Sequence, residues 1–124
     1  MFEVSVMGRF TAAHQLRRAD GVKEPLHRHH WRVTVTFAGP ELDDQGVLLD
    51  FGKIKSRLDE LLETLDDRNL NDLEPFATRI PSAESVAQHV AEQLKLNLPD
   101  GVRLRCVEVE EAPGCVARFF LESR

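Results

Sequence analysis

Two segments near the N-terminus alternate between apolar and polar residues. Residues 2–14 and 29–38 both repeat with a period of two, which is typical of strands that bury one face. A polar, irregular segment, residues 15–26, joins them, and Gly39-Pro40 ends the second. We therefore expect two neighbouring strands connected by a long excursion.

The period then changes to steps of three and four residues, which indicates an amphipathic helix that begins near Asp50. Its apolar positions are Phe51, Ile54, Leu58, Leu61, Leu62 and Leu65. After a loop-like segment, residues 66–81, a second helix begins at Ser82-Ala83-Glu84. This helix buries a stripe of Val86, Val90 and Leu94. His89, in the same helix, is expected at the surface.

The last third returns to strands, roughly residues 102–111 and 115–122, joined by a turn at Ala112-Pro113-Gly114. The order ββααββ predicts an α+β fold: a four-stranded antiparallel sheet with both helices on one face. The hairpin register places Cys106 opposite a residue near Phe120. Cys106 therefore lies too far from Cys115 for a disulfide, and both thiols are expected to be reduced.

Composition predicts one globular domain that covers residues 1–124. Charged residues make up 30% of the chain and apolar residues 42%, as in ordinary soluble domains. The net charge of −5 argues against nucleic acid as a partner. No apolar run reaches membrane-spanning length, and the N-terminus lacks a signal-peptide pattern, so a cytoplasmic location is expected.

His14, His27 and His29 are the candidate metal ligands. Alternate side chains of a strand point the same way, so His27 and His29 can bind one ion from one face. His14 ends the first alternating segment, in step with Phe10 and Ala12. Three neutral imidazoles leave one position of a tetrahedral Zn²⁺ open, as in catalytic zinc sites. A His-x-His pair alone is weak evidence for a metal site, and the sequences around His14 and around this pair strengthen it. His30 has the opposite parity and faces solvent or supports a ligand from behind.

Six segments, in order along nearly the whole chain, resemble the 6-pyruvoyltetrahydropterin and 6-carboxytetrahydropterin synthase family. They are Phe10-Thr11-Ala12-Ala13-His14, His27-Arg28-His29, Gly46–Phe51, Leu65–Asn71, Pro81-Ser82-Ala83-Glu84 and Glu111. The resemblance implies the tunnelling fold, whose sheets associate into a homo-trimer or a homo-hexamer of two stacked trimers. It also implies zinc on the three histidines and 7,8-dihydroneopterin triphosphate as the usual substrate.

The resemblance further assigns the pterin ring to Glu111, with Ser82 and Glu84 as substrate-binding residues. Glu110 is the competing ring anchor, because the register at a strand end is uncertain. Asp66 and Asp67 fall on the Asp-His pair that relays protons in the family. Here Asp67 replaces the histidine.

The catalytic cysteine of the family is replaced by Lys23, and Glu24 follows it. A branch of the family carries Glu-x-x-His-x-His and cleaves the side chain to 6-hydroxymethyl-7,8-dihydropterin. Glu24 fits that spacing before His27, and a carboxylate near zinc can act as general base. The alternative is that Glu24 is only a loop charge. Arg28 replaces a glycine, and can reach a substrate phosphate or lie in solvent.

These features predict a zinc-dependent pterin lyase that acts on 7,8-dihydroneopterin triphosphate or a close relative. The product is a 6-pyruvoyl-, 6-carboxy- or 6-hydroxymethyl-pterin. The alternative is a pterin-binding homologue that keeps zinc and has lost catalysis. Replacement of the family cysteine and histidine favours this alternative, whereas the retained Glu24 and Asp66 speak against it.

Overall fold

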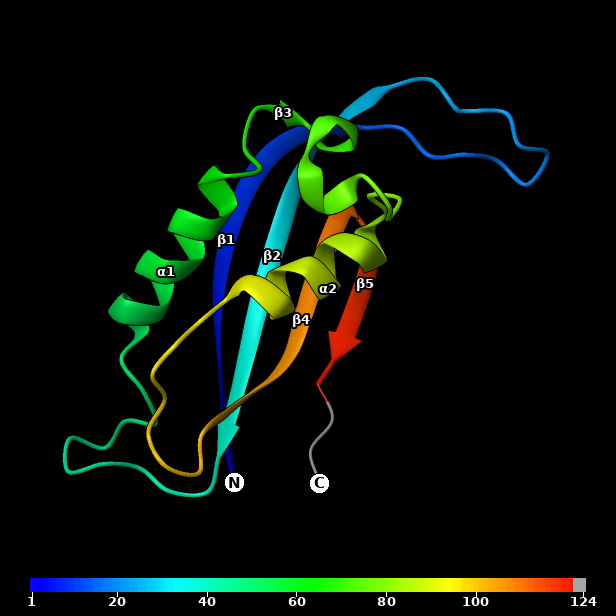
Figure 1. The fold of residues 1–124 in the computed structure, drawn as a ribbon. Coiled ribbons are helices and arrows are strands. Elements are labelled where there is room, and N and C mark those ends of the chain that lie inside the picture. Colours follow the sequence, from blue (N-terminus) through cyan, green and yellow to red (C-terminus); the bar gives the residue numbers. More distant parts are fainter. Residues whose placement is uncertain (122–124) are drawn as a thin grey trace.

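The two N-terminal strands form a long antiparallel ribbon at the centre of the sheet. The computed structural model describes residues 1–121 of the chain. β1 (Phe2–His14) pairs with β2 (His27–Gly39) along its whole length, and His14 lies opposite His27. Both strands are the predicted ones, and β2 begins two residues earlier than expected. The segment between them, residues 15–26, extends beyond the end of the ribbon (Figure 1).

The sheet has five strands in the order β3-β1-β2-β4-β5, so the prediction of four antiparallel strands is wrong. β4 (Arg103–Ala112) and β5 (Cys115–Phe120) form the predicted C-terminal hairpin; residue 122, included in the expected strand, lies outside the described residues. The additional strand, β3 (Arg68–Asn69), runs parallel to β1. Because β3 lies between the helices, the element order is ββαβαββ and not ββααββ.

Backbone bonds to Thr11 explain why β3 forms. The amide of Asp67 donates to the Thr11 carbonyl oxygen at 2.6 Å, and the Asp66 carboxylate accepts from the Thr11 amide at 2.8 Å. These contacts align the next two residues with the edge of β1. A strand of two polar residues has no periodicity, so the hydrophobic pattern could not reveal it.

Both helices cover the same face of the sheet, α1 along β1 and α2 across β4 and β5 (Figure 1). α1 (Phe51–Glu63) begins after Asp50, whose carboxylate accepts from the Gly52 and Lys53 amides. α2 (Ala83–Gln93) begins after Ser82, whose hydroxyl accepts from the Ser85 amide. The predicted α+β architecture with two helices is confirmed. Two 3₁₀ turns, η1 (Leu70–Asp72) and η2 (Glu74–Phe76), lie in the segment predicted as loop.

Close contact between α1 and β1 depends on Gly8. A Cβ atom at this position would lie 2.7 Å from Cδ1 of Leu62, closer than carbon atoms approach without rearrangement. The missing side chain therefore lets the helix pack directly on the strand. No helix among the described residues combines the length and the apolar character that crossing a membrane needs.

His89 is buried, so its expected place at the surface is wrong. Its ring packs against Phe76, with the ring centroids 5.3 Å apart. Burial lowers the pKa of this imidazole. His89 follows Val86 by one helical turn, so the buried face of α2 is wider than the predicted stripe.

The two cysteines are free, as predicted. Cys106 is buried on β4 opposite Phe120, and Cys115 is exposed at the start of β5. Burial raises the pKa of the Cys106 thiol. This thiol is therefore held in its unreactive, protonated form.

Candidate metal and pterin site

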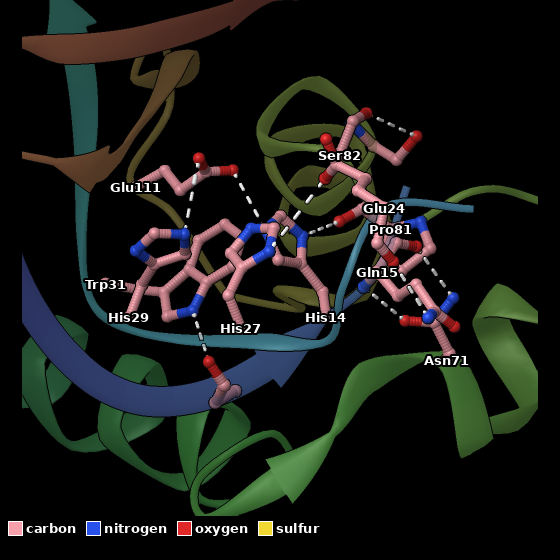
Figure 2. A network of polar contacts seen from close by, with 12 residues as sticks. His14, Gln15, Glu24, His27, His29, Trp31, Asn71, Pro81, Ser82 and Glu111 are labelled. Carbon is pink, nitrogen blue, oxygen red and sulfur yellow. Dashed lines mark hydrogen bonds and ion pairs between the residues drawn. The ribbon is translucent and has the colours of Figure 1, made fainter. Parts of the chain in front are cut away.

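Three histidine side chains converge where β1 ends and β2 begins. His14 lies directly opposite His27 in the strand ladder, and His29 is two residues further along the same face. The centroid of the His27 ring is 4.5 Å from that of His14 and 4.6 Å from that of His29. Figure 2 shows the three side chains side by side. The structure thus brings together the three residues predicted as metal ligands.

Backbone carbonyl groups determine which nitrogen of these rings is free. Nδ1 of His14 lies 2.7 Å from the Pro81 carbonyl oxygen, and Nδ1 of His27 lies 3.0 Å from that of Pro25. A carbonyl oxygen only accepts, so Nδ1 carries the proton in both hydrogen bonds. In the neutral rings, Nε2 therefore offers a lone pair, the form in which histidine binds metals.

Glu111 completes a cluster of four side chains. It shares a face of β4 with the buried Val107 and Val109. Its carboxylate lies 3.3 Å from His14 Nε2 and 3.6 Å from His29 Nε2. One ligand atom from each of the three histidines and from Glu111 lies within 4.8 Å of all the others. The prediction that Glu111 shares a face with Val107 and Val109 holds, but its proximity to the histidines was not predicted.

The donor set fits zinc. Nitrogen ligands from histidine and a carboxylate oxygen are ordinary zinc ligands in proteins. Burial is the main cause that lowers the pKa of His29, and the negative charge of Glu111 opposes it. The lowered pKa favours the neutral ring, which can coordinate a metal. Nε2 of His14 and Nε2 of His29 are both buried, and within residues 1–121 neither has a hydrogen-bond partner.

Glu24 lies next to this cluster, on the segment between β1 and β2. Its carboxylate oxygen is 3.9 Å from Nδ1 of His27, and its side chain is about one-third exposed. The Glu24 amide donates to the Leu16 carbonyl oxygen at 2.8 Å. The side-chain amide of Gln15 donates to the Glu24 carbonyl oxygen at 2.9 Å. These bonds hold the main chain of Glu24 against the end of β1.

Asn71 in turn holds Gln15. Its side-chain oxygen accepts from the Gln15 amide at 2.8 Å, and its side-chain nitrogen donates to the Gln15 carbonyl at 3.0 Å. Figure 2 shows this chain of contacts from Asn71 through Gln15 to Glu24. The turn η1 thereby fixes both the strand end that carries His14 and the segment that carries Glu24. Sequence reasoning did not identify Gln15 or Asn71 as part of the site.

The predicted substrate-binding residues lie around one pocket. Ser82, Glu84 and Glu111 line a pocket of about 350 Å³ between the start of α2 and the hairpin of β4 and β5. Glu110 points to the opposite face of the sheet, where its carboxylate lies 3.5 Å from the Arg32 guanidinium. Of the two candidate ring anchors, only Glu111 therefore faces both the histidines and this pocket.

The sequence profile of one family, described as 6-pyruvoyl tetrahydropterin synthase, matches residues 3–122. The chain belongs to this family. It is 32% identical to dihydroneopterin monophosphate aldolase from Pyrococcus furiosus over 82% of each chain. It is 31% identical to 6-carboxy-5,6,7,8-tetrahydropterin synthase from Bacillus subtilis, over 98% of this chain and 80% of that protein.

The fold agrees with the family. The structure of 6-pyruvoyl tetrahydropterin synthase from Caenorhabditis elegans superimposes with a TM-score of 0.82 and 26% identity, covering 98% of this chain and 96% of that one. The relatives are synthases and an aldolase named for pterins. The family match and these relatives support an enzyme of the pterin lyase or aldolase class.

Asp66 and Asp67, the expected proton relay of this family member, lie outside the four-residue cluster. Asp66 is engaged with the Thr11 amide. Asp67 is largely exposed, adopts a left-handed backbone with φ of 57°, and forms a 2.6 Å ion pair with Arg28. His30, as expected, is exposed, and one ring nitrogen lies 3.0 Å from the Thr11 hydroxyl.

Proposed function

We propose that this protein is a zinc-dependent pterin lyase that acts on 7,8-dihydroneopterin triphosphate or a close relative. The observation that carries this proposal is the convergence of His14, His27 and His29, with Nδ1 of two of them committed to carbonyl oxygens. These three rings would hold the metal. A bound zinc would supply Lewis acidity to a hydroxyl group of the substrate side chain.

Glu111, Ser82 and Glu84 are proposed to bind the ring of the substrate. A pterin presents an amino group and a neighbouring ring N–H along one edge. A carboxylate offers two oxygen acceptors in one plane, so Glu111 is matched to that pair of donors. The pocket that the three residues line adjoins the histidine cluster through Glu111. A ring bound there would direct its side chain towards the histidines.

Glu24 is proposed to be the general base. Its carboxylate lies 3.9 Å from Nδ1 of His27, at the edge of the cluster, and in this proposal it takes the proton of a substrate hydroxyl. Loss of that proton allows the adjacent carbon–carbon bond to break. The electron pair then remains on the carbon attached to the ring, which is reprotonated. This cleavage gives a 6-hydroxymethyl product, and the similarity to an aldolase is in line with it.

Asp66 and Asp67 have different proposed roles. Asp66 orients the strand end through its bond to Thr11. Asp67 can relay protons only if it leaves Arg28, because its carboxylate is paired there. We further propose assembly into a homo-trimer or homo-hexamer. β3 pairs with β1 only at Ala12 and Ala13, which leaves most of that strand edge open to a second copy of the chain.

Two replacements favour a pterin-binding homologue that has lost catalysis. Asp67 stands where the family has a histidine, and its carboxylate is paired with Arg28. Lys23 stands where the family has its cysteine, and its side chain is exposed. Under this alternative the metal and the ring would still bind, whereas no bond would be cleaved.

Incubation of the zinc-loaded protein with 7,8-dihydroneopterin triphosphate, followed by mass spectrometry, tests the proposal and identifies the product. We expect release of a two-carbon fragment, or of triphosphate, in an amount that follows the zinc content. His27→Ala is expected to lose both zinc and turnover. Binding of the substrate without any product would instead support the non-catalytic alternative.

A further inference from the structure

The Glu111 carboxylate lies close to two histidine nitrogens. One of its oxygens lies 3.3 Å from His14 Nε2 and the other lies 3.6 Å from His29 Nε2. Neither contact is a hydrogen bond, and both nitrogen atoms are buried without a partner in the described part of the chain. Three buried or half-buried polar groups therefore face one another without satisfying one another.

The hydrogen bond of His14 to Pro81 makes this arrangement informative. Because Nδ1 of the neutral ring donates to that carbonyl oxygen, its Nε2 has a lone pair and no proton to give. In this geometry the His14 nitrogen and the Glu111 carboxylate leave each other without a hydrogen bond in a buried site, which costs free energy. A cation between them would be coordinated by both, and four such ligand atoms lie within 4.8 Å of one another.

We propose that Glu111 is a fourth protein ligand of the metal in the resting protein and that a pterin ring draws it away, which opens this position. The inference rests on the proposed zinc site. In the resting protein, Glu111 would fill the fourth coordination position until substrate binds. Glu111 is thus both the ring anchor and the group that occupies the place of the reacting hydroxyl.

The surroundings of Glu111 support two alternative positions of its carboxylate. The side chain is about one-quarter exposed, and it borders the pocket that Ser82 and Glu84 line. It comes from β4 next to a register shift between Glu110 and Ala112, where pairing with β5 is interrupted. A glutamate side chain has three rotatable bonds, so it can turn between the histidines and the pocket without movement of the strand.

The exchange has a functional consequence. The two oxygens of Glu111 cannot bind the metal and the paired N–H groups of a ring at full strength together. Binding of the ring therefore weakens coordination of the metal by Glu111. Coordination of the metal by Glu111 weakens binding of the ring to the same extent. A pterin would create the open position at the moment at which its own side chain can enter it.

Metal affinity gives the first test. Chelator competition would measure zinc binding by the parent chain, by Glu111→Gln and by Glu110→Gln. The control Glu110→Gln makes the same chemical change one residue away, on the opposite face. We expect Glu111→Gln to bind zinc roughly tenfold to hundredfold more weakly and Glu110→Gln to match the parent. Glu111→Asp keeps the charge and shortens the side chain, so it serves if Glu111→Gln does not fold.

Equal zinc affinity of the parent and of both Glu111 variants would overturn the inference alone. Absence of zinc binding by the parent, or unchanged zinc binding in His27→Ala, would overturn the proposed metal site as well. The two failures are therefore distinguishable.

The absorption spectrum of the cobalt-substituted protein gives the second test. The probe is 7,8-dihydropterin, which has the ring but lacks the side-chain hydroxyls. We expect it to shift the cobalt bands of the parent and of Glu110→Gln, because Glu111 leaves the metal. We expect no such shift in Glu111→Gln. Calorimetric binding of 7,8-dihydropterin to the parent without a spectral change, or no binding at all, would overturn the exchange.

Discussion

Pro81 contributes a single carbonyl oxygen to the site, yet it determines which nitrogen of His14 faces the cluster. This oxygen lies two residues before α2, next to the Ser82 hydroxyl that caps the helix. The start of α2 therefore orients a metal ligand on β1. Metal-binding histidines commonly donate their second ring N–H in this way, and the donation raises their basicity.

At the same scale, Glu24→Gln tests the proposed base. The amide keeps the size of the side chain but cannot accept a proton. We expect kcat for 7,8-dihydroneopterin triphosphate to fall by about 10²–10⁴-fold, while chelator competition shows an unchanged zinc affinity. The exposed Glu41, on the loop after β2, provides the control Glu41→Gln. Full activity of Glu24→Gln would leave Glu24 as a loop charge only.

The sequence was sufficient to group the three histidines but not to add Glu111 to them. His27 and His29 point to the same face of one strand, and His14 ends the alternating apolar positions of the other. Pairing of these two strands as neighbours was therefore sufficient to predict that the three histidines converge. Glu111 lies on β4, whose distance from the cluster depends on sheet order and on a local register shift. Neither quantity has a signal in the hydrophobic pattern.

At the scale of elements, the short segment between α1 and α2 has a role that its lack of periodicity concealed. β3 attaches it to β1, and η1 then presents Asn71 to the backbone of Gln15. Gln15 extends this support to Glu24. The helices and the four long strands were predictable because each buries an apolar face. This connection was not, because side-chain amides and backbone groups form it.

Asn71→Asp tests that connection. A carboxylate can still accept from the Gln15 amide, but it places negative charge against the Gln15 carbonyl oxygen. We expect the end of β1 to separate from η1 and Glu24 to shift. A displacement of about 1 Å can cost about a hundredfold in rate, so kcat should fall far more than the zinc affinity.

The exposed Asn97 supplies the matched control, Asn97→Asp, which should leave both quantities unchanged. A pH profile of kcat/KM separates positioning from general instability. Displacement of the base shifts the acidic limb of the profile, whereas a smaller folded fraction lowers the whole profile without moving it. An unshifted profile with normal kcat in Asn71→Asp would show that the network does not position Glu24.

At the scale of the whole molecule, buried His89 makes stability depend on pH. Its folded pKa is lowered by burial, so the unfolded chain takes up the proton first as pH falls. The contribution of neutral His89 to the free energy of unfolding is therefore fully present above the unfolded pKa of about 6.5. It is lost progressively as pH falls below that value, and the loss ends only below the lowered folded pKa.

Urea unfolding of the parent and of His89→Gln at about pH 7.5 and about pH 5.5 would measure this contribution. The amide does not titrate, so the stability advantage of the parent over the variant should be smaller at the lower pH. His30→Gln, at an exposed histidine, is the control. A difference between parent and His89→Gln that is the same at both pH values would contradict the prediction.

Trp31 is the single tryptophan of the chain, and it is almost fully buried. Its indole N–H donates to the Ala12 carbonyl oxygen, and its ring lies edge-on to His14 and His29, with centroids 4.9 Å and 6.0 Å away. A metal ion bound to these rings places positive charge beside the indole, which changes its emission. The fluorescence of Trp31 should therefore report metal binding to the histidine cluster, without any added label.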